Sequence, residues 1–327
     1  MAKITILGSG GWGMALALNA YKNAHEVSLW SPFEDEVNSL KKYRTNDRLL
    51  KGIKLPEEIK ITTDLSIIEG DTITVIATPS TVVPSLALQL KDYKDLGIIV
   101  NVSKGFEKDT LRRLSEVIKD ALPRYDVVAL TGPSHAEEVA RNVPTSIVAA
   151  SVSTSAAETV QQLLSNENFR IYTSTDIIGA ELGGALKNVI AVAAGFCDGL
   201  GLGDNSKAAL ITRGLSEMAR LGRKMGANEY TFAGLTGIGD LIVTCTSQHS
   251  RNNRFGYKIG RGMPIKEALE QVGTVEGYYA AEMAFKLSQK YQVEMPIIGE
   301  CYRVLYENKD INSVVYNLMT RPSKKER

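Results

Sequence analysis

The sequence predicts an α/β fold, with an N-terminal doubly wound (Rossmann-type) parallel sheet domain followed by an all-helical C-terminal domain. In the first half of the chain, short apolar runs alternate with helix-like segments, which is the pattern of a sheet covered by helices. Most of these runs are continuously apolar, as is typical of parallel strands buried on both faces. From residue 176 onward only helical patterns occur. A chain of 327 residues suits two domains, which we place at 1–174 and 175–327.

The expected strands of the first domain follow one another in chain order. They are 3–7, 26–30, 60–63, 72–78, 97–103 and 127–131, with a further pair at 146–150 and 170–173 that extends the same sheet. Between them we predict helices at 12–24, 81–91 and 108–121.

The second domain is expected to contain helices and one long loop. The helices are 176–196, 207–225, 265–271, 278–291 and 297–307. The Gly- and polar-rich stretch 234–262 is long enough to be a functional loop. The apolar stretch 182–202 is interrupted by Lys187, Asn188 and Asp198, so we expect a buried helix and no membrane span.

Composition excludes several classes of function. The 38 Lys and Arg against 37 Asp and Glu leave a net charge of +1, which argues against nucleic-acid binding because that needs a basic face. Three cysteines are too few for a disulfide framework, so we expect reduced thiols. Three widely spaced histidines predict no metal site. Strand-like sequence begins at Lys3 and leaves no room for a signal peptide, so we expect a cytoplasmic protein.

A glycine-rich turn follows the first predicted strand and opens the first predicted helix. Its sequence is Gly8-Ser9-Gly10-Gly11-Trp12-Gly13. In this pattern Gly8 permits the tight turn, Gly10 lets the backbone approach a pyrophosphate, and Gly13 lets helix and strand pack closely. The helix offers free N–H groups and a positive dipole end to phosphates. We therefore predict a dinucleotide site here.

The end of the second strand leaves the choice between NAD and NADP open. An acid expected there to bind a ribose 2′-hydroxyl is missing from Ser31-Pro32-Phe33. No Arg or Lys stands at the turn to attract a 2′-phosphate, and Glu34 and Asp35 fall a little late.

Polar residues at strand ends and in one apolar helix are candidates for the chemistry. Lys104 follows the fifth strand, at the carboxyl edge of the sheet where ligands of such folds bind. Ser134 follows the sixth strand and either caps the next helix or faces a ligand. Lys187, with Asn188 beside it, lies in a strongly apolar helix, where desolvation would lower its pKa toward neutrality and suit it to acid/base work. The alternative is a structural lysine whose amine reaches solvent.

The stretch 234–262 contributes further candidate residues. Asp240 follows a Gly-bounded turn and either orients Lys187 or serves the turn itself. Ser250-Arg251-Asn252-Asn253-Arg254 places two guanidinium groups and two amides within five residues, which suits a small phosphate. The alternative is a solvated run of charges.

Six short motifs, taken together in their order along the chain, resemble those of a known enzyme family. They are Gly8-Ser9-Gly10-Gly11-Trp12-Gly13, Lys104-Gly105-Phe106, Gly132-Pro133-Ser134-His135-Ala136-Glu137, Leu186-Lys187-Asn188-Val189, Gly239-Asp240-Leu241 and Ser250-Arg251-Asn252. Over residues 4–319 the chain resembles the bacterial-type NAD(P)-dependent glycerol-3-phosphate dehydrogenases. The resemblance implies reversible hydride transfer between sn-glycerol 3-phosphate and dihydroxyacetone phosphate in the cytoplasm, for glycerophospholipid synthesis.

The resemblance also implies roles for individual residues. Lys187 is the proton donor or acceptor, and Lys104 and Asp240 complete the catalytic site. The residues implied for substrate are Lys104, Gly132, Ser134, Lys187, Asn188, Asp240, Ser250, Arg251 and Asn252. Those implied for NAD or NADP are Gly8, Gly10, Gly11, Trp12, Gly13, Lys104, Ala136, Arg251, Thr274 and Glu276. Many family members carry Arg or His where this chain has Pro32 and Phe33, so the cofactor preference stays undecided.

Two other functions fit the same fold. One is a β-hydroxyacid or ketopantoate-type reductase. The cluster around Arg251 disfavours this hypothesis, because a carboxylate substrate needs fewer hydrogen-bond donors there. The other is a non-catalytic NAD(P) sensor. The acid/base groups of Lys104, Lys187 and Asp240 disfavour this hypothesis, because a sensor would need none. The expected partners are the small-molecule substrate and a second copy of the chain in a homodimer.

Overall fold

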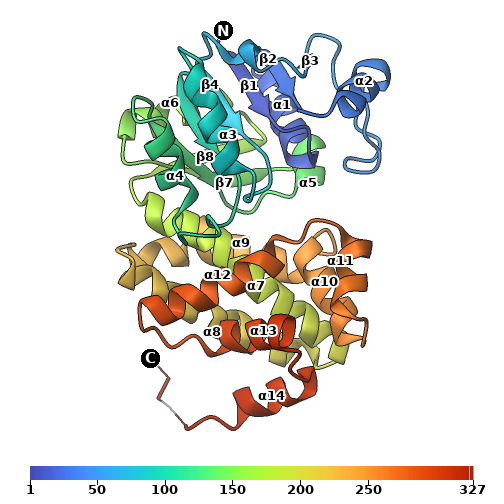
Figure 1. Ribbon diagram of the computed structural model, residues 1–327, viewed down its shortest axis with the longest axis vertical. Helices are drawn as coiled ribbons and strands as arrows, with labels where there is room; N and C mark the ends of the chain where they lie inside the picture. The colour runs from blue at the N-terminus through green and yellow to red at the C-terminus, as the bar shows by residue number, and fades with distance from the viewer. Residues whose placement is uncertain (324, 327) are drawn as a thin grey trace.

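The computed structural model describes residues 1–323 and 325–326. Figure 1 shows two lobes stacked along the long axis, one built on a sheet with helices around it and the other built from helices. The last strand ends at Ser174 and the next helix begins at Ile177, so the chain passes between the lobes there. The predicted fold class is confirmed.

Eight strands form one sheet in the order β3-β2-β1-β4-β5-β6-β7-β8. They are β1 (Lys3–Leu7), β2 (Glu26–Trp30), β3 (Lys60–Thr62), β4 (Ile73–Ile76), β5 (Ile98–Asn101), β6 (Val127–Thr131), β7 (Thr145–Ala150) and β8 (Phe169–Ser174). Every predicted strand is present. The strand order reverses at β1, and ligands of open α/β sheets bind beyond the carboxyl ends of the strands at such a point.

The predicted all-parallel sheet needs one correction, because β7 runs antiparallel to β6. A parallel neighbour requires a crossover from one edge of the sheet to the other, whereas an antiparallel one does not. Residues 132–144, which join the two strands, therefore stay at the carboxyl edge. Gly132 and Ser134 are held at that edge as a result.

Six helices belong to the sheet lobe. They are α1 (Gly11–Lys22), α2 (Glu34–Tyr43), α3 (Val83–Gln89), α4 (Leu114–Ala121), α5 (Ala136–Ala140) and α6 (Thr154–Leu164). The helix predicted at 108–121 begins only at Leu114, because Leu111 has a left-handed φ of 60° and Glu116 accepts from the backbone N–H of Arg113. The sequence did not predict α2, in which only Val37 and Leu40 are buried.

The helical lobe is built around one long helix. Its members are α7 (Ile177–Leu200), α8 (Gly203–Lys224), α9 (Asp240–Thr246), α10 (Arg251–Gly260), α11 (Ile265–Val272), α12 (Glu276–Lys290), α13 (Pro296–Glu307) and α14 (Ile311–Met319). By length and hydropathy α7 could cross a membrane, but 94% of its most apolar stretch is buried among the other helices. The predicted buried helix is confirmed.

The expected long loop at 234–262 is wrong, since most of it is helical. A π-helical turn, Leu235–Gly239, leads into α9, and α10 follows. Two glycines, one on α10 and one on α7, serve close packing between these helices. A Cβ on Gly256 would lie 2.1 Å from the carbonyl oxygen of Val192, and one on Gly195 would lie 2.1 Å from that of Asn253. The backbones of α7 and α10 therefore touch, which only glycine permits.

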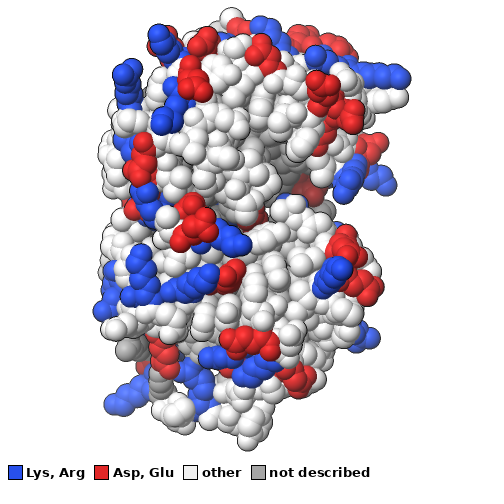
Figure 2. Space-filling model, in the orientation of Figure 1, with Lys and Arg blue, Asp and Glu red and all other residues white. Residues whose placement is uncertain are grey.

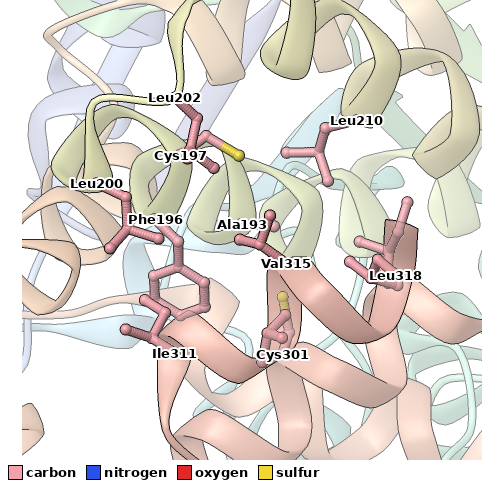
Figure 3. Close-up of a pocket in the computed structure, with 12 residues that line it drawn as sticks. Ala193, Phe196, Cys197, Leu200, Leu202, Leu210, Cys301, Ile311, Val315 and Leu318 are labelled. Carbon is pink, nitrogen blue, oxygen red and sulfur yellow. The ribbon is translucent and has the colours of Figure 1, made fainter. Parts of the chain in front are cut away.

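A small apolar cavity lies between α7, α8, α13 and α14 (Figure 3). Its volume is about 40 Å³, and Cys197 and Cys301 line it together with aliphatic side chains such as Leu318. The three cysteines are free, as predicted. Burial raises the pKa of Cys197 to about 11, so its thiol stays protonated near neutral pH.

Candidate active site

Three charged side chains from separate parts of the chain meet between the lobes. Lys104 Nζ donates to Asp240 Oδ2 at 2.7 Å and to the carbonyl oxygen of Gly132 at 3.0 Å. Lys187 Nζ donates to the other carboxylate oxygen of Asp240 and to Thr244 Oγ1 at 2.8 Å. One carboxylate thus joins a lysine of the sheet lobe to a lysine of α7.

Adjacent glycines on α7 make this meeting possible. A Cβ on Gly183 would lie 2.2 Å from the carbonyl oxygen of Thr236, so the π-helical turn packs directly on α7 and places Asp240 beside Lys187. A Cβ on Gly184 would lie 2.9 Å from the hydroxyl of Thr131 and 3.4 Å from Cγ of Lys104. π-Turns inside helices are frequent at functional sites, and this one brings an acid to the lysines.

Burial and mutual charge set the protonation of this group. Side-chain exposure is 18% for Lys104, 7% for Lys187 and 1% for Asp240. Desolvation lowers the pKa of Lys187 to about 7; the charge of Asp240 opposes this shift and that of Lys104 adds to it. For Asp240, burial raises the pKa, but the charges of both lysines outweigh burial and hold its pKa below the usual value. Asp240 therefore stays ionised, and Lys187 can give or take a proton near neutral pH.

The glycine-rich turn lies at the amino end of α1 and is shaped to receive a ligand. Gly8 has a φ of 127°, and a Cβ there would lie 2.6 Å from the carbonyl oxygen of Ala77. At Gly13 a Cβ would lie 1.9 Å from the carbonyl oxygen of Gly8. By contrast, a Cβ on Gly10 would meet no atom within 4 Å. No side chain caps α1 and no acid stands in its first turn, so its N–H groups can bind phosphates. These residues fit a dinucleotide.

The loop after β6 lies beside this turn. A Cβ on Gly11 would lie 3.7 Å from the Cβ of Ala136, the first residue of α5. The structure does not support Ser134 as a helix cap: the N-cap of α5 is His135, and Ser134 Oγ donates to the carbonyl oxygen of Gly132 at 2.9 Å. Ser134 and Lys104 therefore hold the same carbonyl group at the edge of the sheet.

The predicted phosphate cluster begins α10 and divides into two kinds of residue. Ser250 caps the helix by accepting from the backbone N–H of Asn253 at 3.2 Å. The Asn252 side chain donates to Asn188 at 2.9 Å and accepts from the backbone N–H of Gly277 at 2.9 Å, so it ties α10 to α7 and α12. Arg251 is exposed and forms no ion pair within 1–323 and 325–326. Arg254 is exposed as well, so these two arginines are the side chains of the cluster that remain available to a ligand.

Glu276 reaches the sheet lobe from the start of α12. Its carboxylate accepts from the backbone N–H and the hydroxyl of Ser80, in the loop after β4. Thr274 is exposed two residues earlier, and its contact with the cofactor stays a prediction. Figure 2 shows the surface hollowed where the two lobes meet, with acidic and basic side chains interspersed over both lobes.

The sequence did not single out three contributors to this region. Thr244, on the turn of α9 after Asp240, accepts from Lys187. Glu181, six residues before Lys187 on α7, accepts from the backbone N–H of Ser115 at 2.8 Å and from Arg113 at 2.7 Å, which links α7 to α4. Glu36 lies against the glycine-rich turn. Its position as the third residue of α2 could have identified it, because a glutamate at this position commonly folds back toward the start of the helix.

Comparison with known proteins agrees with the resemblance seen in the sequence. The family model for the N-terminus of NAD-dependent glycerol-3-phosphate dehydrogenase matches residues 3–157, and the model for its C-terminus matches residues 176–316. The chain is 47% identical to glycerol-3-phosphate dehydrogenase (NAD(P)+) of Desulfitobacterium hafniense over 328 residues, covering 100% of this chain and 93% of the relative.

Solved structures separate the two enzyme hypotheses. The crystal structure of glycerol-3-phosphate dehydrogenase from Coxiella burnetii has a TM-score of 0.94 and 39% identity, covering 98% of this chain and 99% of that one. A ketopantoate reductase from Ralstonia eutropha has a TM-score of 0.63 and 16% identity over 97% of this chain and 99% of its own, which shows a shared fold alone. The chain belongs to the NAD(P)-dependent glycerol-3-phosphate dehydrogenase family.

Proposed function

We propose that the chain transfers a hydride reversibly between sn-glycerol 3-phosphate and dihydroxyacetone phosphate with NAD(P), and so supplies the backbone of glycerophospholipids. The observation that carries this proposal is the group Lys104, Asp240 and Lys187, set between the lobes of a chain that matches the family along its length. The nicotinamide ring, when bound, supplies or accepts the hydride. The chain's own residues bind, orient and move a proton.

Lys187 is the proton donor when the ketone is reduced and the proton acceptor when the alcohol is oxidised. Its lowered pKa suits both directions near neutral pH. Asp240 holds the Lys187 amine in place and keeps one negative charge beside two amines. Lys104 polarises the carbonyl and stabilises the developing alkoxide, a contribution of about 3–4 kcal/mol for a well-placed donor in a dry site.

Arg251 binds the substrate phosphate together with the amino end of α10. The guanidinium group offers a two-pronged donor, and the helix start adds N–H groups and a positive dipole end. Ser250 and Asn252 shape this helix start and are assigned to the substrate by the same proposal. Phosphate binding at a distance from the carbonyl holds the reacting carbon in place.

Three further assignments belong to this proposal. We place the dinucleotide-binding domain at 1–174 and the helical substrate domain at 175–327, supported by one large apolar cluster around the sheet and another mainly among the helices. The cytoplasm is the proposed location, supported by three free thiols. The proposed homodimer would appear in light scattering as twice the 35.6 kDa of one chain.

The experiment follows NADH and NADPH absorbance with dihydroxyacetone phosphate as substrate, and with ketopantoate in parallel. Turnover of the first substrate alone is expected. Lys187→Met should lower kcat by about 10²–10⁴-fold and leave the Kd of the dinucleotide within about twofold of the wild type. Lys224→Met, at an exposed position of α8, is the matched control and should keep full activity. Retained turnover in Lys187→Met would refute its role, and turnover of ketopantoate alone would refute the substrate.

A further inference from the structure

An acidic side chain that the strand pattern does not reveal stands at the end of β2. Glu36 Oε2 accepts from Ser9 Oγ at 2.5 Å and from Ser31 Oγ at 2.7 Å. Ser9 belongs to the glycine-rich turn, and Ser31 directly follows β2; both are buried, with exposures of 3% and 2%. The carboxylate is therefore held by two hydroxyl groups from two different loops.

Backbone contacts fix where this carboxylate lies relative to the predicted dinucleotide site. The backbone N–H of Gly8 donates to the carbonyl oxygen of Trp30 at 2.9 Å, so the glycine-rich turn and the end of β2 are side by side. In doubly wound folds, an acid at this position binds the adenosine ribose through its 2′-hydroxyl. Here the acid comes from the first turn of α2, six residues after the strand, instead of from the strand end.

We propose that Glu36 is the residue that selects the cofactor: it binds the ribose hydroxyls of NAD(H) and disfavours the 2′-phosphate of NADP(H). The inference rests on the dinucleotide site proposed above and adds the preference that the sequence left undecided.

The unused oxygen of the carboxylate supports this role. Within the described part of the chain, both hydrogen bonds of Glu36 go to Oε2, and Oε1 accepts none. Oε1 is thus the atom left to accept from a ribose hydroxyl. The two serine hydroxyls fix the direction of the carboxylate in advance, so little side-chain entropy is lost on binding.

The charges around Glu36 point the same way. The first turn of α2 carries Glu34, Asp35 and Glu36, whereas its basic residues, Lys41 and Lys42, lie in the last turn. Pro32 and Phe33, between β2 and α2, are uncharged. A 2′-phosphate placed here would meet carboxylates and no fixed cation from this segment, and like charges at close range repel.

The test measures the Kd of NADH and of NADPH by quenching of protein fluorescence, without substrate. The fluorescence comes from two tryptophans, Trp12 in the first turn of α1 and Trp30 at the last residue of β2. The wild type should bind NADH at least about tenfold more tightly than NADPH, the effect of one close charge repulsion. Glu36→Gln keeps a hydrogen-bond acceptor and removes the charge. The ratio of the Kd of NADPH to the Kd of NADH should therefore fall by about tenfold, mainly because NADPH binds more tightly.

Glu158→Gln is the matched control, because it makes the same charge change at an exposed position of another helix of the sheet lobe, α6. In this control, the ratio of the Kd of NADPH to the Kd of NADH should stay within about twofold of the wild type, because exposed charges are screened. Equal wild-type affinity for both dinucleotides, a preference for NADPH, or an unchanged ratio in Glu36→Gln would each overturn the inference. The wild-type ratio decides it even if Glu36→Gln does not fold.

The outcomes also separate this inference from the proposed reaction. NADH binding with the expected ratio, but no turnover of dihydroxyacetone phosphate, would support the role of Glu36 and contradict the reaction. Binding of neither dinucleotide would overturn both.

Discussion

The carboxylate of Glu276 accepts from both the backbone N–H (3.1 Å) and the hydroxyl (2.6 Å) of Ser80, so the first residue of α12 is bound to the loop after β4. Glu181 makes a second connection, from α7 to Ser115 in α4. The Lys104–Asp240 ion pair is a third connection between the lobes. These contacts together fix how the two lobes face each other around Lys104 and Lys187.

Glu276→Ala should destabilise the protein by about 1–3 kcal/mol, because it leaves the buried Ser80 hydroxyl without its partner. Urea unfolding followed by circular dichroism measures this change. Glu270→Ala, at an exposed position of α11, should stay within about 0.5 kcal/mol of the wild type. Equal stability of the two variants would show that the contact with Ser80 contributes nothing.

The rate of ketone reduction should fall as the pH rises through about 7, because desolvation lowers the pKa of Lys187 to that value and reduction needs its protonated form. Oxidation of the alcohol needs the neutral amine and should rise over the same range. Lys104→Met removes a positive charge that lowers the pKa of Lys187, so the midpoint should move to higher pH. Profiles of kcat against pH for both directions measure these shifts. A midpoint that does not move in Lys104→Met would contradict the coupling of the lysines.

Glu217→Gln should become more stable relative to the wild type as the pH rises from about 4.5 to about 7. Burial raises the pKa of Glu217 to about 7, despite its bonds to the backbone N–H groups of Ile297 and Ile298. A folded-state pKa above the unfolded one means that the wild type loses stability over this range, by up to about 3 kcal/mol. Glutamine does not titrate and loses none. Unfolding free energies at pH 5 and pH 8 test this, and a difference that stays constant with pH would contradict it.

Gly256→Ala should destabilise the protein by about 1–3 kcal/mol or more, because the added methyl group would lie 2.1 Å from the carbonyl oxygen of Val192 and force α10 away from α7. Gly299→Ala is the matched control in α13, where the nearest atom to the new Cβ is the end of the Arg303 side chain at 3.7 Å. There alanine should stabilise by about 0.5–1 kcal/mol through its helix propensity. Thermal melts compare the two, and equal melting temperatures would refute the close contact of the helices.

Local patterns were enough to predict most of the fold. Short strand-like runs identified every strand, and the signature is most continuous in β4 and β6, which are buried along their whole length. The glycine-rich turn could be placed between β1 and α1 because a tight turn needs its glycines at the turn itself. Lys187 stood out because a charge in a buried helix is costly.

Contacts between distant segments decided the rest. The glycines of 234–262 indicate a loop when taken alone, and only the packing of α10 on α7 shows that Gly256 and Gly260 are needed for helix contact. Asp240 acquires its role from the amines of Lys104 and Lys187, 136 and 53 residues away. The sequence by itself determined which segments form the strands, where several of the helices lie and which chemical groups are present. Tertiary structure decided which of those groups meet, as Glu36 meets Ser9 and Ser31, because hydrogen bonds and desolvation depend on distances in space that the spacing of residues along a chain does not record.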